Sequence, residues 1–242
     1  MIVLSAGMPR AGSGWHYNLI HDLMKTTGCA DLHEIREKYH LQHILTEVNG
    51  NIGVLSARRL AQVSLPALLG RTFVIKAHAG PTRSSRLLQN LGLLRITYIY
   101  RDPRDAMLSA YEYGQRTRAN GRSNAFSHLA DFQNSVDFMM DYVHIWERWM
   151  KEKGVLVARY EDLLTDYDAE SSRLADFLNV DEDRPEVRAV IEKYRPGAAP
   201  GGPGLHFQKG KIGRFREVYT LENQAILQAK LAPYLARMGY AV

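Results

Sequence analysis

The first residues of the chain that could do chemistry are of the types that bind anions. Gly7 and Gly12 are separated by four residues, and Arg10 lies between them. Ser13 and Gly14 follow directly. An apolar run precedes this segment and an apolar-periodic stretch follows it, which predicts a strand, a glycine-rich loop and a helix. The first N–H groups of a helix have no partner within the helix, so such a loop attracts phosphate or sulfate.

The spacing of the two glycines matches the Walker A phosphate-binding loop, but the residues that follow do not. Walker A requires Lys and then Ser or Thr after the second glycine. Ser13 follows Gly12 with no intervening lysine, and Arg10 is the only cation in the loop. We therefore expect an anion-binding loop that is not an ordinary ATPase or GTPase site. A simple turn with tolerated glycines is the alternative.

A second group of candidate residues follows an expected buried strand at residues 73–75. Lys76 and His78 come at the carboxyl end of this strand, and strand alternation places both side chains on one side. Ligands of open parallel sheets bind at that end. The alternative is a solvated lysine and a histidine that merely hydrogen-bonds at the strand end.

Two further strands end in side chains suited to an anionic ligand. Arg101 follows the strand expected at residues 96–100, and Ser109 lies on the next helix. Together they could clamp a second phosphate, although a salt-bridge cluster at a helix start is the alternative. Tyr160 ends a third strand, expected over residues 155–160.

The alternation of strands and helices predicts an α/β protein with a three-layer, P-loop-like fold. A central parallel sheet with helices on both faces would position these residues. The length suits a single domain over residues 1–242. Flexible loops are expected at about residues 114–125, which could form a lid, and at residues 195–213, which are rich in glycine.

Composition limits the class of protein. The net charge of +5 favours an anionic ligand, and nucleic acid, a membrane surface or a phosphorylated small molecule would each fit. Cys29 is the only cysteine, which excludes an intrachain disulfide and a thiolate-rich metal site. No segment approaches the ~20 apolar residues of a membrane span, and no signal peptide is recognisable. A cytoplasmic protein is the default expectation.

Four segments, in order along the chain, resemble the sulfotransferases that use 3′-phosphoadenosine 5′-phosphosulfate (PAPS). They are Pro-Arg-Ala-Gly-Ser-Gly-Trp at 9–15, Lys-Ala-His at 76–78, Arg-Asp-Pro-Arg-Asp at 101–105 together with Ser109, and Tyr-Glu-Asp-Leu at 160–163. A fifth segment, Gln-Lys-Gly at 208–210, resembles the family's C-terminal loop more weakly.

The resemblance implies a nucleotide-binding set. Its members are Arg10, Ala11, Gly12, Ser13, Gly14, Trp15, Arg101, Ser109, Tyr160, Gln208, Lys209 and Gly210. The loop residues would hold the 5′-phosphosulfate, and Arg101, Ser109 and the C-terminal loop would hold the 3′-phosphate. Trp15 and Tyr160 would flank the adenine.

The resemblance also implies a reaction. The sulfuryl group of PAPS would pass to a hydroxyl of a small-molecule acceptor, releasing adenosine 3′,5′-bisphosphate (PAP). His78 would act as the general base, and Lys76 and Arg10 would neutralise developing charge. No metal is required where protein cations supply the stabilisation.

Three departures from the family pattern carry consequences. Arg10 stands where the family has Lys, and an arginine is a poor proton donor to the leaving phosphate. Gln208 replaces an arginine, which implies weaker selection for the 3′-phosphate. The family's C-terminal dimer motif is only half present, since Ala225 stands where Glu is expected. We therefore expect a monomer or a weak homodimer.

Two other functions stay open from the sequence. A P-loop phosphotransferase would need the Walker lysine and an acid to hold Mg²⁺. A non-catalytic anion-binding module would not need Lys76 and His78 together at one strand end. A phenolic or hydroxylated natural product is favoured as the acceptor over an anionic sugar, and neither nucleic acid nor a membrane is the expected partner.

Overall fold

The fold is built on a four-stranded, all-parallel sheet. The structure is a computed structural model that describes residues 1–197 and 210–241. The strands are β1 (Ile2–Gly7), β2 (Phe73–Ala77), β3 (Leu94–Tyr100) and β4 (Val155–Arg159), in the spatial order β2-β1-β3-β4. The chain passes from β1 to one side and later returns to the other, so the carboxyl end of β1 is the position where a ligand crevice is expected.

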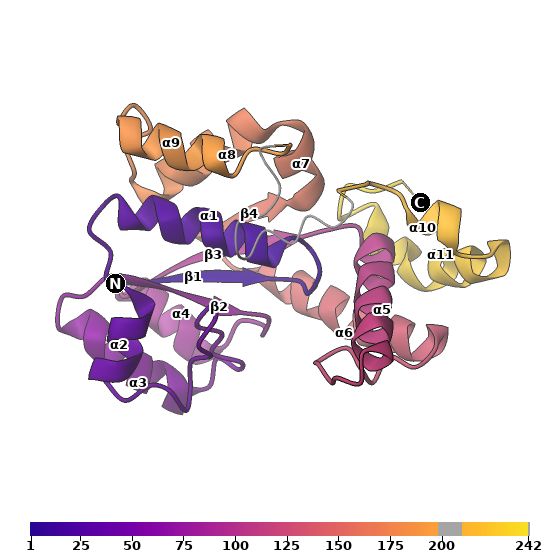
Figure 1. The fold of residues 1–242 in the computed structure, drawn as a ribbon, viewed down its shortest axis with the longest axis horizontal. Helices are drawn as coiled ribbons and strands as arrows, with labels where there is room; N and C mark the ends of the chain where they lie inside the picture. The colour runs from indigo at the N-terminus through magenta and orange to yellow at the C-terminus, as the bar shows by residue number, and fades with distance from the viewer. Residues whose placement is uncertain (198–209, 242) are drawn as a thin grey trace.

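Helices cover both faces of the sheet (Figure 1). One face carries α1 (Ser13–Lys25), α7 (Tyr160–Thr165), α8 (Tyr167–Leu178) and α9 (Pro185–Lys193). The other carries α2 (Leu32–Lys38), α3 (Ala57–Leu68), α4 (Arg83–Asn90) and α6 (Phe132–Trp149). Beyond the carboxyl end of the sheet lie α5 (Pro103–Ala119), α10 (Phe215–Val218) and α11 (Leu221–Leu235). The predicted three-layer α/β architecture is confirmed.

Side chains on the strands alternate between two hydrophobic cores. Leu4 and Ile75 belong to the core that contains α3 and α6, whereas Val3 and Val74 belong to the core that contains α1. Lys76 is two residues beyond Val74, so it points to the α1 face. Its register partner on β1 is the buried Ser5.

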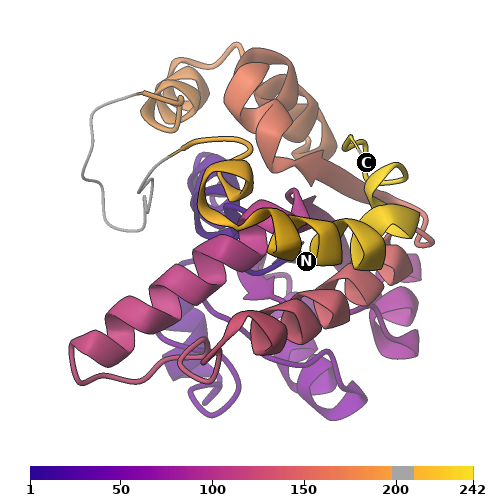
Figure 2. The ribbon, with the colours of Figure 1, turned by 90° about the vertical axis from the view of Figure 1, so that its right-hand side faces the viewer.

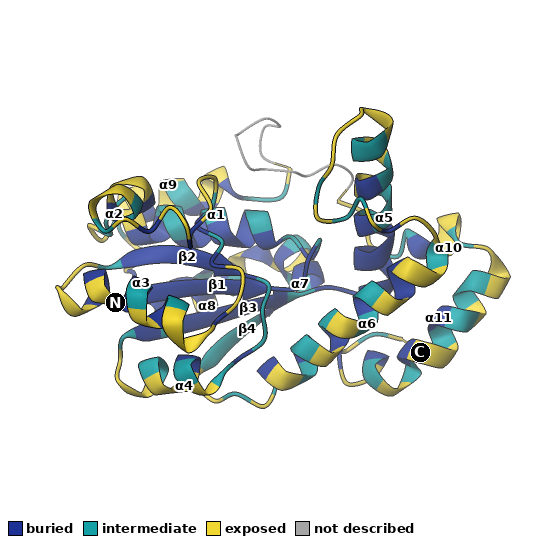
Figure 3. Cartoon of the chain, turned by 90° about the horizontal axis from the view of Figure 1, so that it is seen from below, coloured by how far each residue is buried: buried dark blue, intermediate teal, exposed yellow. Residues whose placement is uncertain are grey.

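One loop prediction was wrong in part. Residues 114–119 were expected to belong to a surface loop, but α5 continues to Ala119. Its first turns are buried and its last turns are exposed (Figure 3), and the exposed end projects from the fold (Figure 2). A projecting helix needs few large apolar residues, which explains why its sequence resembles that of a loop.

Aspartate side chains cap two of the helices. Asp102 is the N-cap of α5, and its carboxylate accepts a hydrogen bond from the N–H of Arg104 at 2.9 Å. The Asp131 carboxylate caps α6 by accepting from Asn134 N–H, and α6 begins at Phe132. No helix in the described ranges 1–197 and 210–241 is long and apolar enough to cross a membrane.

Gly114 allows the backbone at Phe126 to pack directly against α5. A Cβ at position 114 would lie 2.2 Å from the Phe126 carbonyl oxygen. Gly114→Ala should therefore lower stability by about 1–3 kcal/mol through overpacking, although alanine is the better helix former. The change would be measured as the free energy of unfolding in urea.

Gln115→Ala is the matched control, since this neighbouring side chain is only half-buried. We expect it to leave the unfolding free energy almost unchanged. A Gly114→Ala protein as stable as the parent would contradict the assigned contact between α5 and Phe126.

Candidate active site

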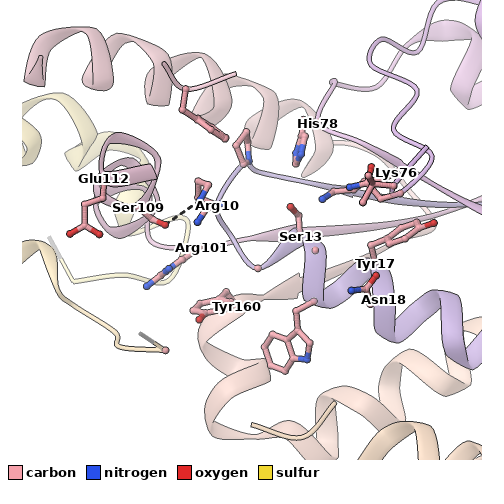
Figure 4. A pocket seen from close by; sticks show the side chains of 18 of the residues that line it. Arg10, Ser13, Tyr17, Asn18, Lys76, His78, Arg101, Ser109, Glu112 and Tyr160 are labelled. Atoms are coloured by element: carbon pink, nitrogen blue, oxygen red, sulfur yellow. Dashed lines mark hydrogen bonds between the residues drawn. The ribbon is translucent and has the colours of Figure 1, made fainter. Parts of the chain in front are cut away.

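A cavity of about 420 Å³ opens at the carboxyl end of the sheet. Its wall is built from the loop after β1, the first turns of α1, the ends of β2 and β3, α5, Tyr160 and residues 210–214. Ser109 and Arg101 lie at one end of the cavity and Lys76 and Asn18 at the other (Figure 4). The sheet thus brings together the residues that the sequence places at four different strand ends.

The loop after β1 requires glycine at two positions. Gly12 precedes α1 with φ 75°, and a Cβ there would lie 2.6 Å from the Tyr160 ring. A Cβ on Gly7 would lie 2.6 Å from the side chain of Ile99. These close approaches bring the N-terminus of α1, with Ser13 and Gly14 in its first turn, to the cavity wall. A helix N-terminus in this position favours a bound phosphate or sulfate.

Arg10 links the loop to α5. Its backbone has φ 63°, and its Nε donates a hydrogen bond to Ser109 Oγ at 3.2 Å. The guanidinium carbon lies 4.6 Å from the centre of the Tyr113 ring and 5.9 Å from that of Phe126. Arginine can form these stacked contacts while keeping its charge, so Arg10 is held beside Ser109 and Arg101 in the cavity (Figure 4).

His78 is held in one tautomer. Its Nδ1 lies 2.6 Å from the carbonyl oxygen of Gly7, and because a carbonyl only accepts, Nδ1 carries the proton. The lone pair is therefore on Nε2. Burial, followed by the nearby charge of Lys76, lowers the pKa of His78 to about 4, so the imidazole is neutral at pH 7.

Lys76 is buried next to His78 in the cavity wall. Burial, followed by the charge of Arg10, lowers the pKa of Lys76 to about 8. An anion bound beside the ammonium would favour its charged form. Lys76 is thus the cation whose charge depends most directly on a ligand.

The segment that precedes α3 reaches Lys76 through the backbone. Lys76 N–H donates to Gly50 O at 3.2 Å, and Ile52 N–H donates to Lys76 O at 2.9 Å. This pairing brings Val48 and Asn49 into the cavity wall. Sequence reasoning missed both residues, since backbone hydrogen bonds leave no signal in residue type.

Arg101 joins three elements at the other end of the cavity. Its guanidinium lies 4.4 Å from the centre of the Tyr160 ring, and an Nη donates to Lys211 O at 2.8 Å. The buried Asp105 carboxylate accepts from Gly213 N–H at 2.6 Å and from Phe215 N–H at 3.0 Å. These bonds fix residues 211–215 against the start of α5.

Sequence reasoning also missed a charged pair in the wall. Glu112 and Arg214 form a two-point ion pair, with N–O distances of 2.6 and 3.2 Å. Arg116 lines the same wall one helical turn after Glu112. The helical spacing from Ser109 could have indicated both α5 residues, had residues 114–119 been predicted as helix.

The other predicted nucleotide-binding residues fall into three groups. Gly210 lines the cavity, whereas Gln208 and Lys209 lie outside the described residues. Ala11 is packed in the core, and its N–H bonds to Met8 O, so its side chain does not line the cavity. Trp15 lines the cavity, donates from Nε1 to Tyr194 O at 2.9 Å and stacks on Tyr167.

A family model for the sulfotransferase domain matches residues 2–195. The chain belongs to the sulfotransferase domain family. Mouse sulfotransferase 4A1 (Mus musculus) is 23% identical over 133 residues, covering 52% of this chain and 47% of the relative. Rabbit amine sulfotransferase (Oryctolagus cuniculus) is 22% identical over 150 residues, covering 53% and 50%. The chain spans about half the length of these curated relatives.

Solved structures of this family share the fold of the chain. Retinol dehydratase in a complex with retinol and PAP superposes with a TM-score of 0.61 at 18% identity, over 97% of this chain and 81% of that one. Mouse sulfotransferase SULT7A1 with PAP gives 0.53 at 17% identity, over 96% and 84%. Among the described residues, no group of three or more His, Cys, Asp or Glu side chains could hold a metal ion.

The pKa of Lys76 predicts how nucleotide affinity depends on pH. The free protein loses the Lys76 charge above about pH 8, and a bound anion restores it by taking up a proton. The affinity for PAP should therefore fall as pH rises through about 8, approaching about tenfold per pH unit because one proton is involved. Calorimetric titrations between about pH 7 and 10 would measure this fall.

Lys76→Met provides the control for this dependence. Without a titrating ammonium, the affinity of the variant for PAP should be lower and nearly constant over the same range. A flat profile for the parent protein would show that Lys76 does not titrate against the ligand.

Proposed function

We propose that this domain transfers the sulfuryl group of PAPS to a hydroxyl group of a small-molecule acceptor and releases PAP. The observation that carries the proposal is the convergence of a neutral histidine, a buried lysine and a helix N-terminus in one cavity. PAP in the related solved structures supports the donor. Retinol and androsterone, present in retinol dehydratase complexes, support a small acceptor.

The described cavity residues fit a nucleotide with two anionic groups. The 5′ group would be held by the N-terminus of α1 and Ser13, and the 3′ group by Arg101 and Ser109. The buried Arg101 Nε has no hydrogen-bond partner within residues 1–197 and 210–241, which leaves a donor for an anion. Trp15 and Tyr160 would contact the adenine. PAPS, when bound, supplies the activated sulfuryl group.

His78 and Lys76 would perform the protein's part of the chemistry. The Nε2 lone pair of His78 accepts the acceptor's hydroxyl proton as its oxygen attacks, because Nδ1–H is committed to Gly7 O. A neutral imidazole at pH 7 is ready to accept that proton. Lys76 stabilises negative charge that develops on the transferring group and the leaving phosphate.

His78→Ala tests the assignment of the base. Loss of a general base typically lowers turnover by ~10²–10⁴-fold, whereas PAP affinity should stay nearly intact because the side chain lies at the acceptor end of the reaction. Turnover would be measured with radiolabelled PAPS, and PAP affinity by calorimetry. His33→Ala, at an exposed position on α2, is the control. Parent-like turnover in His78→Ala would rule out His78 as the base.

Arg10→Lys tests whether position 10, where the family has lysine, requires only a positive charge or also the planar guanidinium group. Lysine keeps the charge but loses the planar stacking on Tyr113 and the directed bond to Ser109. Because these contacts hold Arg10 in place before the ligand arrives, we expect PAP affinity to fall by about fivefold to tenfold. Calorimetry would measure it, and unchanged affinity with unchanged or higher turnover would mean that only positive charge matters.

The proposed reaction itself is tested in two steps. A thermal-shift titration with PAP first establishes nucleotide binding. Transfer of labelled sulfur from PAPS to a panel of phenols and alcohols then establishes the activity. Magnesium-dependent turnover of ATP would instead support a phosphotransferase. Binding of a polyanion that needs no nucleotide, without any transfer, would support an anion-binding module.

A further inference from the structure

One cation in the cavity wall has no role in the nucleotide binding proposed above. The lining cations are Arg10, Lys76, Arg101, Arg116, Lys211 and Arg214. Arg214 is paired with Glu112, the one lining carboxylate within the described part of the chain. A phosphate monoester carries about 1.5–2 negative charges at pH 7, so Arg10, Lys76, Arg101 and Lys211 suffice for a nucleotide with two such groups. Arg116 is left over.

The Arg116 side chain forms no hydrogen bond and no ion pair with any other residue of ranges 1–197 and 210–241. Burial is the largest cause that lowers the pKa of Arg10, and the charge of Arg116 acts in the same direction, so the two guanidinium groups are close enough to repel. An anion bound near Arg116 would relieve this repulsion.

The position of Arg116 separates it from the 3′-phosphate clamp. Arg116 is seven residues beyond Ser109 on α5, which is about 10 Å along a helix axis. It lies in the last turn of α5, two residues after Gly114, which packs against Phe126, and both Arg116 and Phe126 line the cavity. Arg10 contacts Phe126 and also donates to Ser109, so Arg10 links this part of the wall to the clamp.

The wall around Lys76 is also polar. Asn18 and Tyr17 lie beside Lys76 (Figure 4), and Asn49 lines the same end of the cavity. Amide and hydroxyl groups near Lys76 suit a ligand with several polar groups. Val48, next to Asn49 in the chain, adds an apolar side chain to the wall.

We propose that the acceptor is a hydroxylated carboxylic acid whose carboxylate pairs with Arg116 while its hydroxyl lies at His78. The inference rests on the proposed sulfuryl transfer and specifies, in addition, that the acceptor is negatively charged. The guanidinium fork matches a carboxylate in two-point geometry. Arg116 is exposed at the rim, so the attraction also weakens with added salt.

The test compares acids with their neutral amides. The probes are 4-hydroxyphenylacetate with 4-hydroxyphenylacetamide, and glucuronate with glucuronamide, each assayed for kcat/KM with labelled PAPS and for binding to the PAP-saturated protein. For at least one pair, we expect the acid to show about tenfold higher kcat/KM and about tenfold tighter binding than its amide, which is the effect of one charge-assisted hydrogen bond. In Arg116→Gln this ratio should fall to about one.

Arg122→Gln is the matched control, because it removes the same charge from an exposed position outside the cavity wall. It should keep the acid-to-amide ratio of the parent. The proposal is overturned if acids and amides bind equally well and are sulfated at equal rates. It is also overturned if neither the acid nor the amide of any pair binds or is sulfated. A ratio that Arg116→Gln leaves unchanged overturns it as well. Failure of PAP to bind would instead overturn the proposed function, since the acceptor's charge has no effect on that measurement.

Discussion

The contact between Gly12 and the Tyr160 ring determines the geometry of the whole cavity. Because Gly12 has no Cβ, the loop after β1 can approach the end of β4 closely enough for both to line the same wall of the cavity. Tyr160 in turn lies under the Arg101 guanidinium, which Asp105 and residues 211–215 hold in place. The absence of a side chain at Gly12 therefore allows the N-terminus of α1 to pack against Tyr160, which in turn contacts Arg101 at the cationic end of the cavity.

Burial affects the protonation of Lys76 and His78 more than ion pairing does. Lys76 is buried and His78 is partly buried, and in each case burial is the largest cause of the lowered pKa. The result is a neutral base beside a cation that a bound anion can strengthen. The ion pair between Glu112 and Arg214 removes one charge of each sign from this balance, which leaves the cavity strongly positive.

The sequence predicts the parts of the fold that short-range patterns encode. Apolar runs that end in Gly7, Lys76, Arg101 and Tyr160 identified the strands, and parallel pairing alone brings such ends together. The end of α5 was missed because its polar residues face water and the reason for Gly114 lies twelve residues later, at the Phe126 carbonyl. The placement of Asn49 beside Lys76 depends on backbone hydrogen bonds, which residue types do not encode.

The backbone pairing of residues 50–52 with Lys76 has a consequence for protein engineering. Gly50 and Ile52 hold this segment through their main-chain groups, so the neighbouring side chains are not needed to keep it in place. Val48 is 89% exposed, and Asn49 makes a side-chain bond only to Thr46 within the described structure. A combinatorial library at these two positions would vary the side chains that line the cavity while leaving its backbone and the positions of Lys76 and His78 unchanged.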